Sequence, residues 1–427
     1  MKQEGVVHGE PPGTPIIPRE RGKIFYGWVI VGCAFVILCV AYGIQFSFGV
    51  FMPAIEAETG WDRARLSLPY SLYVFVYSAL GVVAGRWTDR WGPRAVIIAG
   101  GCLLGLGTVL MSQVRTLWQL YLFLGAIAAS GMSAAYVPCN ATVVRWFIQR
   151  RGFALSITSS GASFGNFLFP PLAAALISAY GWRTAYQLLG LIGAAVIGLC
   201  ATFIVRDPEH MHLYPDGHKP NNVAYSELPQ QPIEGWTLAA ARRTSTFWLL
   251  NVIFTLTWLV VFFPLIHIAP FALDLGLPQL QAAMTISVIG VAGFAGRLVT
   301  GPLSDRLGRK LALGLCLLLQ ALAFLGFIVS TGLVSLYTAA AVFGFSYGGA
   351  TTLFPAIIGD YFGRLAVGAI VGFMFSLAGS TAAFGPILAG YLYHTTGHYD
   401  VAFALSAALN GASLVFLLFL RRPGCAK

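Results

Sequence analysis

Charged residues are scarce in this 427-residue chain. Asp, Glu, Lys and Arg together make up 10% of the sequence, whereas hydrophobic residues make up 57% and the mean hydropathy is +0.75. A soluble domain carries about a quarter of its residues as charged side chains, because polar groups must cover its surface. The shortage of charge excludes an ordinary soluble globule, and we expect the chain to reside in a lipid bilayer.

Cysteine motifs and a leader segment are also lacking. The seven cysteines include no Cys-x-x-Cys pair, so we expect small buried residues rather than a redox motif or a metal site. The first 22 residues contain no apolar core followed by a cleavage site, which favours a short disordered tail over residues 1–23. No nucleophile, base or metal cluster can be assembled from the apolar segments, and we therefore predict neither an enzyme nor a cofactor.

Long uncharged runs, by contrast, are abundant. They cover residues 24–55, 66–85, 95–114, 116–144, 152–182, 184–205, 244–273, 275–296, 311–359, 365–399 and 401–420. A helix needs about 20 residues to cross the hydrocarbon core. The run 311–359 has twice this length and is interrupted by the turn residues Ser330, Thr331 and Gly332, so it supplies two spans. The sequence predicts an all-α membrane protein with twelve transmembrane helices.

The net charge of +10 follows the loops rather than a nucleic-acid interface. If the N-terminus is cytoplasmic, most lysines and arginines fall in the inner loops and tails, whereas the outer loops hold only Arg63, Arg65, Arg115 and Arg183. This is the positive-inside bias of membrane proteins. It predicts a multi-pass protein of the inner (plasma) membrane with both termini in the cytoplasm, and no nucleic acid as a partner.

The sequence repeats itself after ~216 residues. The segment "GRWTDRWGPR" at 85–94 returns as "GPLSDRLGRK" at 301–310, Pro170 corresponds to Pro386, and Gly181 corresponds to Gly397. We expect two pseudo-symmetric six-helix bundles over residues 24–205 and 244–420, joined by a polar cytoplasmic linker over 206–243 and followed by a cytoplasmic tail over 421–427. Two matched halves around a midplane cleft are typical of an alternating-access carrier.

The pattern GxxxDRxGxR, which follows the second and eighth predicted spans, resembles the loop motif of the major facilitator superfamily. Within it, "YGWVIVGCAF" in the first span and "WFIQRRGFALSITSSG" in the fifth resemble the monocarboxylate transporters and the bacterial oxalate:formate antiporter group, a resemblance that covers residues 24–420. It implies that each motif acid clasps neighbouring helix ends and stabilises the state closed to the cytoplasm; the alternative is a solvated loop charge. The implied gating residues are Gly85, Asp89, Arg90, Gly92, Arg94, Gly301, Asp305, Arg306, Gly308 and Arg309.

Arg297 is the one basic residue that the loops do not explain. It lies eight residues before Asp305, about 12 Å along a helix axis, at or beyond the reach of a side chain that must extend to the membrane surface; the alternative to a buried site is that the side chain does extend that far. All acidic residues fall in tails, loops or helix ends, so we expect the counter-ion to be an anionic substrate. The planar guanidinium suits a carboxylate. The resemblance implies the same role, since this branch has an arginine in the eighth span as its carboxylate ligand.

Three departures from the family pattern narrow the range of expected substrates. The animal monocarboxylate carriers have an acidic residue one turn before this arginine, where the chain has Gly293, and a lysine in the first span, where it has Gln45 and Phe46. The oxalate antiporter has a second cation in the eleventh span, which contains none here. A single cation favours a monoanion over a dianion such as oxalate.

Further candidate ligands lie on spans that the resemblance places around the cavity. They are Tyr136 and Asn140, one turn apart on the fourth span, Gln45 on the first, Tyr347 on the tenth, and Phe375 and Ser376 on the eleventh. The alternative for these side chains is interhelical packing. His267 is a possible proton site, and its alternative is a hydrogen-bonded histidine at the membrane interface. The small-residue runs "GVAGFAG" and "SSGASFGN" are predicted to be close-packing helix faces.

The sequence thus predicts a secondary transporter of small monocarboxylates such as lactate or pyruvate, coupled to a proton. The first alternative is an anion exchanger of the oxalate:formate kind, which would need an anion on the opposite side of the membrane rather than a pH gradient. A receptor with the same fold would need a soluble signalling domain, for which the linker leaves no room. We expect the partners to be the anion, a proton and the bilayer, with no obligatory protein partner.

Overall fold

The computed structural model describes residues 25–61, 63–217 and 235–423. Over these ranges the chain is helical and contains no strand, apart from one isolated bridge between Gly235 and Gly363. The tail predicted over residues 1–23, the middle of the predicted linker and the last four residues lie outside the described ranges.

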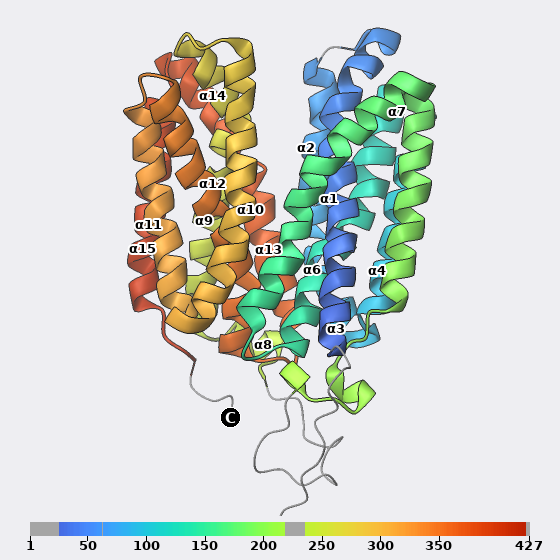
Figure 1. The fold of residues 1–427 in the computed structure, drawn as a ribbon, viewed down its shortest axis with the longest axis vertical. Helices are drawn as coiled ribbons and strands as arrows, with labels where there is room; N and C mark the ends of the chain where they lie inside the picture. The colour runs from blue at the N-terminus through green and yellow to red at the C-terminus, as the bar shows by residue number, and fades with distance from the viewer. Residues whose placement is uncertain (1–24, 62, 218–234, 424–427) are drawn as a thin grey trace, which may run out of the picture.

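Two groups of long helices stand side by side, one from each half of the chain (Figure 1). The N half consists of α1 (Tyr26–Thr59), α2 (Arg63–Ala79), α3 (Gly81–Trp91), α4 (Pro93–Met111), α5 (Leu117–Leu120), the π-helical η1 (Tyr121–Ala128), α6 (Ala129–Trp146) and α7 (Arg151–Thr202). The C half consists of α9 (Ser245–Asp274), α10 (Gln279–Leu307), α11 (Arg309–Ile328), α12 (Leu333–Phe362), α13 (Val367–Ala382), α14 (Gly385–Thr396) and α15 (Asp400–Phe419). Short helices η2 (Pro208–Met211), η3 (Pro215–Gly217) and α8 (Leu238–Ala241) lie between the halves in sequence.

Over the residues that the structure describes, twelve spans can be assigned, as the sequence predicts. Within the described residues, eleven helical stretches are long and apolar enough to cross a membrane. One of these, α7, contains two helices joined at Gly181, whose φ of 79° is the left-handed conformation that glycine adopts without strain. The predicted break inside residues 311–359 is also confirmed, because α11 ends at Ile328 and α12 begins at Leu333.

Small residues let neighbouring helices approach until their backbones touch. A Cβ atom placed on Gly165 of α7 would lie 2.0 Å from the carbonyl oxygen of Cys39 on α1. A Cβ atom on Gly296 of α10 would lie 2.0 Å from the carbonyl oxygen of Phe345 on α12. These glycines belong to the runs "SSGASFGN" and "GVAGFAG", so both runs form the close-packing faces expected of them.

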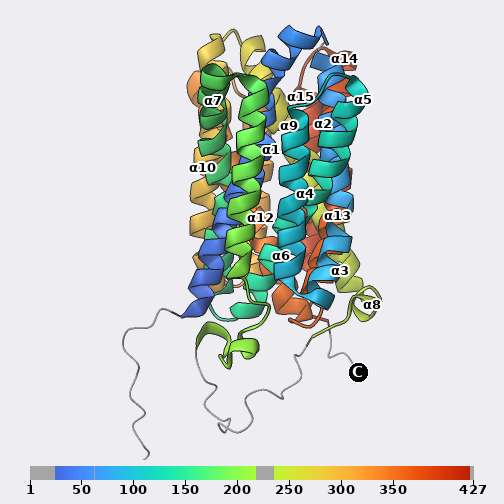
Figure 2. The ribbon, with the colours of Figure 1, turned by 90° about the vertical axis from the view of Figure 1, so that its right-hand side faces the viewer.

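The two halves meet at one end of the molecule. They converge towards the end that carries the linker and diverge towards the opposite end (Figure 1), while the turned view shows the helices running the full height between both ends (Figure 2). We call these ends the linker face and the far face. Within the described residues, the hydrogen bonds and ion pairs between the halves lie near the linker face or midway along the spans, and none joins the far-face ends. The structure is therefore closed at the linker face.

Candidate functional site

Arg297 lies within α10 and contacts both halves of the molecule. Only 7% of its surface is exposed. Its Nε donates to Oγ1 of Thr351 on α12 at 3.4 Å, and its Nη1 donates to the carbonyl oxygen of Ser159 on α7 at 3.3 Å. The same Nη1 donates to Oγ of Ser163, one turn further along α7. The guanidinium carbon also lies 5.8 Å from the centre of the Tyr347 ring.

The partners of this guanidinium carry no charge. In the part of the chain that the structure describes, Arg297 donates to a backbone carbonyl and two hydroxyl oxygens and forms no ion pair with a carboxylate. Arginine keeps its positive charge in proteins, and a buried charge with no opposing charge is costly. An anion that reached Arg297 would remove this cost, so the arrangement suits the binding of an anion.

Tyr136 and Asn140 of α6 belong to the same polar network. The Tyr136 hydroxyl donates to the carbonyl oxygen of Thr351 at 3.3 Å, and its ring stacks on Phe375 of α13 with 4.9 Å between ring centres. The Asn140 amide donates to the carbonyl oxygen of Tyr136 at 2.8 Å, and its Oδ1 accepts from Oγ of Ser159 at 3.5 Å. Since Ser159 and Thr351 also bind Arg297, both predicted side chains connect to it.

We call this network the central cluster. Its members are Tyr136, Asn140, Ser159, Ser163, Arg297, Tyr347, Thr351 and Phe375. The sequence predicted the arginine, the asparagine, both tyrosines and the phenylalanine, and it missed the two serines and the threonine. Ser376 lies elsewhere and donates to the carbonyl oxygen of Ala79.

The missed serines share a helical run with the packing glycines. In "SSGASFGN", Gly161 and Gly165 are one turn apart and touch α1, while Ser159 and Ser163 are one turn apart on another face and contact Arg297. Residues four apart lie above one another on a helix. The i, i+4 spacing of the two serines was therefore visible in the sequence. It was overlooked because the whole run was interpreted as a packing face.

Gln45 is an exception among the predicted ligands. The structure places its side chain inside the N half, where it lines a cavity of about 20 Å³ with Tyr73, Thr108 and Tyr186. Its Oε1 is buried without a hydrogen-bond partner among the described residues, and a cavity of this size has room for about one water molecule. Since α1 turns this residue towards the interior of its own bundle, no hydrogen bond in the described part of the chain joins Gln45 to Arg297 directly, and its role as a substrate ligand stays a prediction.

His267 also lies apart from the central cluster. Its Nδ1 is 3.2 Å from the Tyr399 hydroxyl, and the Tyr399 ring stacks on Tyr393 with 4.3 Å between ring centres. These tyrosines flank the turn between α14 and α15 at the far face of the C half (Figure 1). The geometry fits the alternative of a hydrogen-bonded interfacial histidine.

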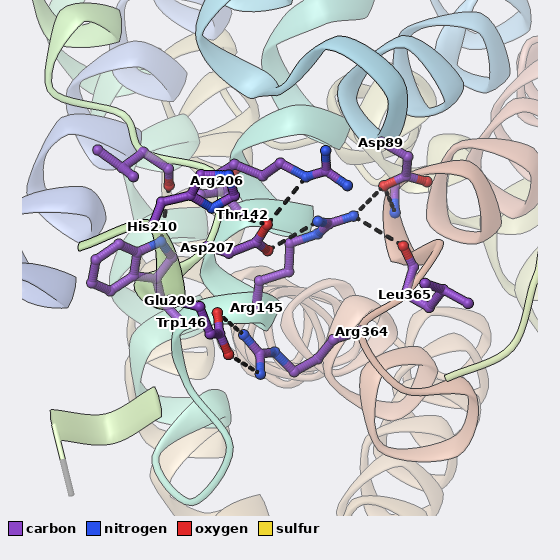
Figure 3. Close-up of polar contacts among 12 residues, drawn as sticks. Asp89, Thr142, Arg145, Trp146, Arg206, Asp207, Glu209, His210, Arg364 and Leu365 are labelled. Atoms are coloured by element: carbon purple, nitrogen blue, oxygen red, sulfur yellow. Dashed lines mark hydrogen bonds and ion pairs between the residues drawn. The ribbon is translucent and has the colours of Figure 1, made fainter. Parts of the chain in front are cut away.

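In the first copy of the loop motif, Asp89 binds the start of a helix from the opposite half. It accepts from the backbone nitrogens of Gly368 at 3.1 Å and Ala369 at 2.6 Å, in the first turn of α13. Arg145 of α6 donates to the same carboxylate at 2.6 Å and to Asp207 at 3.0 Å (Figure 3). The side chains of Arg145 and Asp207 are each 1% exposed, so this is a buried ion network.

In the second copy of the loop motif, Asp305 binds the start of a helix from the opposite half, as Asp89 does in the first copy. It accepts from the backbone nitrogens of Gly152 at 2.9 Å and Phe153 at 3.0 Å, in the first turn of α7. Arg309, four residues along, pairs with Asp305 at 2.5 Å and with Asp360 at 3.0 Å. Asp360 of α12 also pairs with Arg151 of α7, which makes a direct ion pair between the halves.

The motif glycines make these approaches possible. A Cβ atom on Gly85 would lie 2.0 Å from the carbonyl oxygen of Gly368, and one on Gly301 would lie 2.4 Å from that of Gly152. Gly92 and Gly308 form the turns after the motif helices, with φ of 86° and 89°. The remaining predicted gating residues, Arg90, Arg94 and Arg306, are exposed. The structure instead brings Arg145 to Asp89, and it brings Asp360, with its partner Arg151, to Arg309; none of these three was predicted as a gating residue.

The described parts of the linker attach to both halves. Asp216 accepts from the backbone nitrogens of residues 148, 149 and 150 in the N half, at 2.8 to 3.2 Å. Glu209 binds both Nη atoms of Arg364 of the C half at 2.9 and 3.1 Å (Figure 3). Trp236 donates its backbone N–H to the carbonyl oxygen of Phe362, also in the C half.

The sequence comparisons agree on one group of proteins. The family model described as Major Facilitator Superfamily matches residues 34–333 and 270–427. The chain is 29% identical to monocarboxylate transporter 11 of Homo sapiens, over 97% of this chain and 88% of that protein. It is 27% identical to monocarboxylate transporter 13 of Bos taurus, over 92% of this chain and 89% of that protein.

Solved structures show the same fold at lower sequence identity. The proton:xylose symporter XylE bound to 6-bromo-6-deoxy-D-glucose matches with a TM-score of 0.74 and 13% identity, over 93% of this chain and 96% of that chain. The human organic anion transporter MFSD10 matches with a TM-score of 0.72 and 16% identity, over 92% of this chain and 99% of that chain. These likenesses bear on the fold alone.

Proposed function

The chain belongs to the major facilitator superfamily, and we propose that it is a secondary transporter of small monocarboxylate anions such as lactate or pyruvate. It moves them by alternating access across the inner (plasma) membrane, together with a proton. The names of its relatives, monocarboxylate transporters 11 and 13, support the substrate class. The positive-inside bias supports a cytoplasmic linker face.

The observation that carries this proposal is the buried, positively charged side chain of Arg297, which has neutral partners on both halves. A carboxylate is a planar acceptor that a guanidinium can bind through two parallel hydrogen bonds. Tyr136 and Tyr347 flank this position from opposite halves and favour a small organic acid. With one cation in the cluster, a monoanion neutralises the site and a dianion leaves a surplus charge.

The two motif copies act as the gate at the cytoplasmic side. Asp89 and Asp305 each hold the first turn of a helix from the opposite half, where backbone N–H groups and the helix dipole favour an anion. These contacts must break for the linker face to open. In this proposal the structure represents the state that is closed to the cytoplasm.

The charge of the site supports the proposed coupling to a proton. The empty cluster is positive and the loaded cluster is neutral, and moving one charge across the membrane involves about 2.3 kcal/mol per 100 mV. A proton that accompanies each anion makes net transport electroneutral. His267 remains the candidate carrier, although it lies with Tyr399 and outside the central cluster.

An anion exchanger is the second candidate function. The observation that favours it is the same missing counter-ion, because an obligate exchanger never needs to return a positively charged empty site across the membrane. The two functions differ in their driving force. An exchanger takes up labelled acid only when liposomes are preloaded with another anion, and it ignores a pH gradient.

Proteoliposome uptake of labelled lactate, pyruvate, formate and oxalate tests the proposal. Uptake of a monocarboxylate should require an acidic outside and should respond little to a potassium diffusion potential at equal pH. Arg297→Ala should lower uptake about 100-fold, because the charge that binds the carboxylate is lost. Arg297→Lys keeps the charge but loses the two-point fit, and we expect about a tenfold loss.

The matched control is Arg115→Ala, which removes an exposed arginine outside the cluster. It should insert and transport like the unmodified protein. Near-normal uptake by Arg297→Ala would contradict the assignment of the carboxylate site.

A further inference from the structure

The guanidinium of Arg297 is a cross-link between the halves. Arg297 belongs to α10 of the C half, and its Nη1 donates to two oxygens of α7 in the N half, the Ser159 carbonyl and the Ser163 hydroxyl. The other polar links between the halves include the motif contacts near the linker face. Arg297 is eight residues from Asp305, about 12 Å along the helix axis, so its link lies deeper in the molecule.

The link is made by the same atoms that a substrate needs. A carboxylate that engages Arg297 end-on, through parallel hydrogen bonds from Nη1 and Nη2, requires a free Nη1–H group, and Nη1 is directed at α7 in this structure. A charged oxygen forms a stronger hydrogen bond with a guanidinium than a hydroxyl does. An incoming carboxylate therefore has the chemistry to replace the serine as a partner.

We propose that Ser163 is a positioning residue that holds Arg297 against α7 while the site is empty, and that the substrate carboxylate displaces it. The empty transporter is then tied across its midplane, and arrival of the anion releases α7 from α10 and favours opening at the linker face. The identity of the displacing anion rests on the proposed function, whereas the tie itself depends only on Arg297 and Ser163.

Ser163 is the residue to change because its side chain makes the contact. Ser159 contributes its backbone carbonyl, which a side-chain substitution leaves in place. Ser160 is a matched control on the same helix, since its hydroxyl donates to the carbonyl oxygen of Ile157 within α7 and does not link the halves. Ser163→Ala therefore weakens the tie by one hydrogen bond, Ser163→Asp strengthens it, and Ser160→Ala leaves it unchanged.

The test measures the two conformations directly. Spin labels are placed on Trp91→Cys at the end of α3 and Leu307→Cys at the end of α10, two exposed positions of opposite halves at the linker face, in a chain without its native cysteines. Pulsed electron spin resonance in lipid nanodiscs then gives the populations with short and long separations. Each variant is measured without anion and with saturating lactate.

Without anion, Ser163→Ala should raise the ratio of linker-open to linker-closed molecules about tenfold, as expected for one hydrogen bond to a charged group. Ser163→Asp supplies a resident carboxylate and should shift the ratio towards the closed state. Ser160→Ala should match the parent. Lactate should open the parent, and its effect should be much smaller in both Ser163 variants, because the Ser163 hydrogen bond is either absent already or no longer displaceable.

The outcomes separate this inference from the proposed function. An empty-state ratio that Ser163→Ala leaves unchanged would overturn the tie, whatever the substrate is. A shifted empty ratio combined with no effect of lactate or the other acids in the parent would support the tie and refute the substrate class. A lactate effect of equal size in the parent and in Ser163→Ala would overturn the displacement step.

Discussion

Asp89 and Asp305 hold helix starts of the opposite half in the same way, yet their cations come from different places. Each carboxylate accepts two backbone N–H bonds, from residues 368 and 369 or from residues 152 and 153. Asp89 recruits Arg145, a residue of another helix of its own half, while Asp305 uses Arg309 four positions along the chain. The helix contacts are common to both repeats, and the ion networks are not.

This difference changes which parts of the molecule each network connects. Arg145 also binds Asp207, so the N-half network includes the linker. Arg309 also binds Asp360, which pairs with Arg151, so the C-half network crosses between the halves by an ion pair, whereas the N-half network crosses by bonds to backbone groups such as the Leu365 carbonyl oxygen. The C-half network holds two carboxylates and two buried arginines and is balanced. The N-half network holds two carboxylates around one buried arginine. Arg206 also pairs with Asp207, but about a third of its side chain is exposed to solvent.

The largest expected effect comes from Asp360→Asn. It removes the direct ion pair between the halves and leaves Arg151 and Arg309, with side chains 4% and 7% exposed, facing one carboxylate. Removing one partner of a buried pair costs about 3–5 kcal/mol. The cost falls on the closed state, because these groups are hydrated when the linker face opens. The Trp91 and Leu307 spin labels should report an almost complete shift to the open state.

Asp207→Asn is the counterpart of this change in the N-half network. Arg145 keeps Asp89 as its partner, and the partly exposed Arg206 can turn to water. The pair of Arg145 and Asp207 lies within the N half and the linker segment attached to it, so most of the cost of losing it falls on both states, and we expect the ratio of states to shift by about 1 kcal/mol or less. Equal shifts in Asp207→Asn and Asp360→Asn would show that the two networks are equivalent locks after all.

An intermediate effect should separate the two motif acids. Asparagine keeps an oxygen for the helix N–H groups and loses the charge, so each substitution removes about 1–3 kcal/mol of charge-assisted bonding. Asp305→Asn leaves two buried arginines with one carboxylate, whereas Asp89→Asn leaves Arg145 with Asp207. The same spin-label measurement should show a larger opening for Asp305→Asn. A larger opening for Asp89→Asn would contradict this difference in charge balance between the two networks.

The two networks also differ in how much of each could be predicted from the sequence. The twelve spans depend on local apolar length, and the motif acids and glycines depend on a local pattern, so both could be found. Arg145 lies 56 positions from Asp89, and only folding brings the two together. In the sequence Arg145 and Arg151 appear as ordinary positive-inside charges. Gln45 lies beside a cavity of the N half, a position that the sequence could not give, because α1 has buried residues on several faces and sequence alone does not say which face meets the other half.

The smallest effect should come from the ion pair between Glu209 of the linker and Arg364 of the C half, which lies beside the N-half network. Both carboxylate oxygens are engaged, but the two side chains are 30% and 13% exposed, so water competes for the pair. Such pairs contribute about 0.2–1 kcal/mol and weaken at high salt. Glu209→Gln should therefore open the linker face a few-fold at low salt and hardly at all in 1 M salt.

The control for this last change is Asp216→Asn, which alters another linker acid whose bonds, to residues 148 to 150, stay within the N half. It should leave the ratio of states unchanged. The reversed pair Glu209→Arg with Arg364→Glu should restore most of what each single substitution loses, because the attraction depends on opposite charge and not on which side carries it. If Glu209→Gln instead opened the face as far as Asp360→Asn, the linker would be the principal lock, and the repeated helix contacts of Asp89 and Asp305 would serve mainly to align the halves.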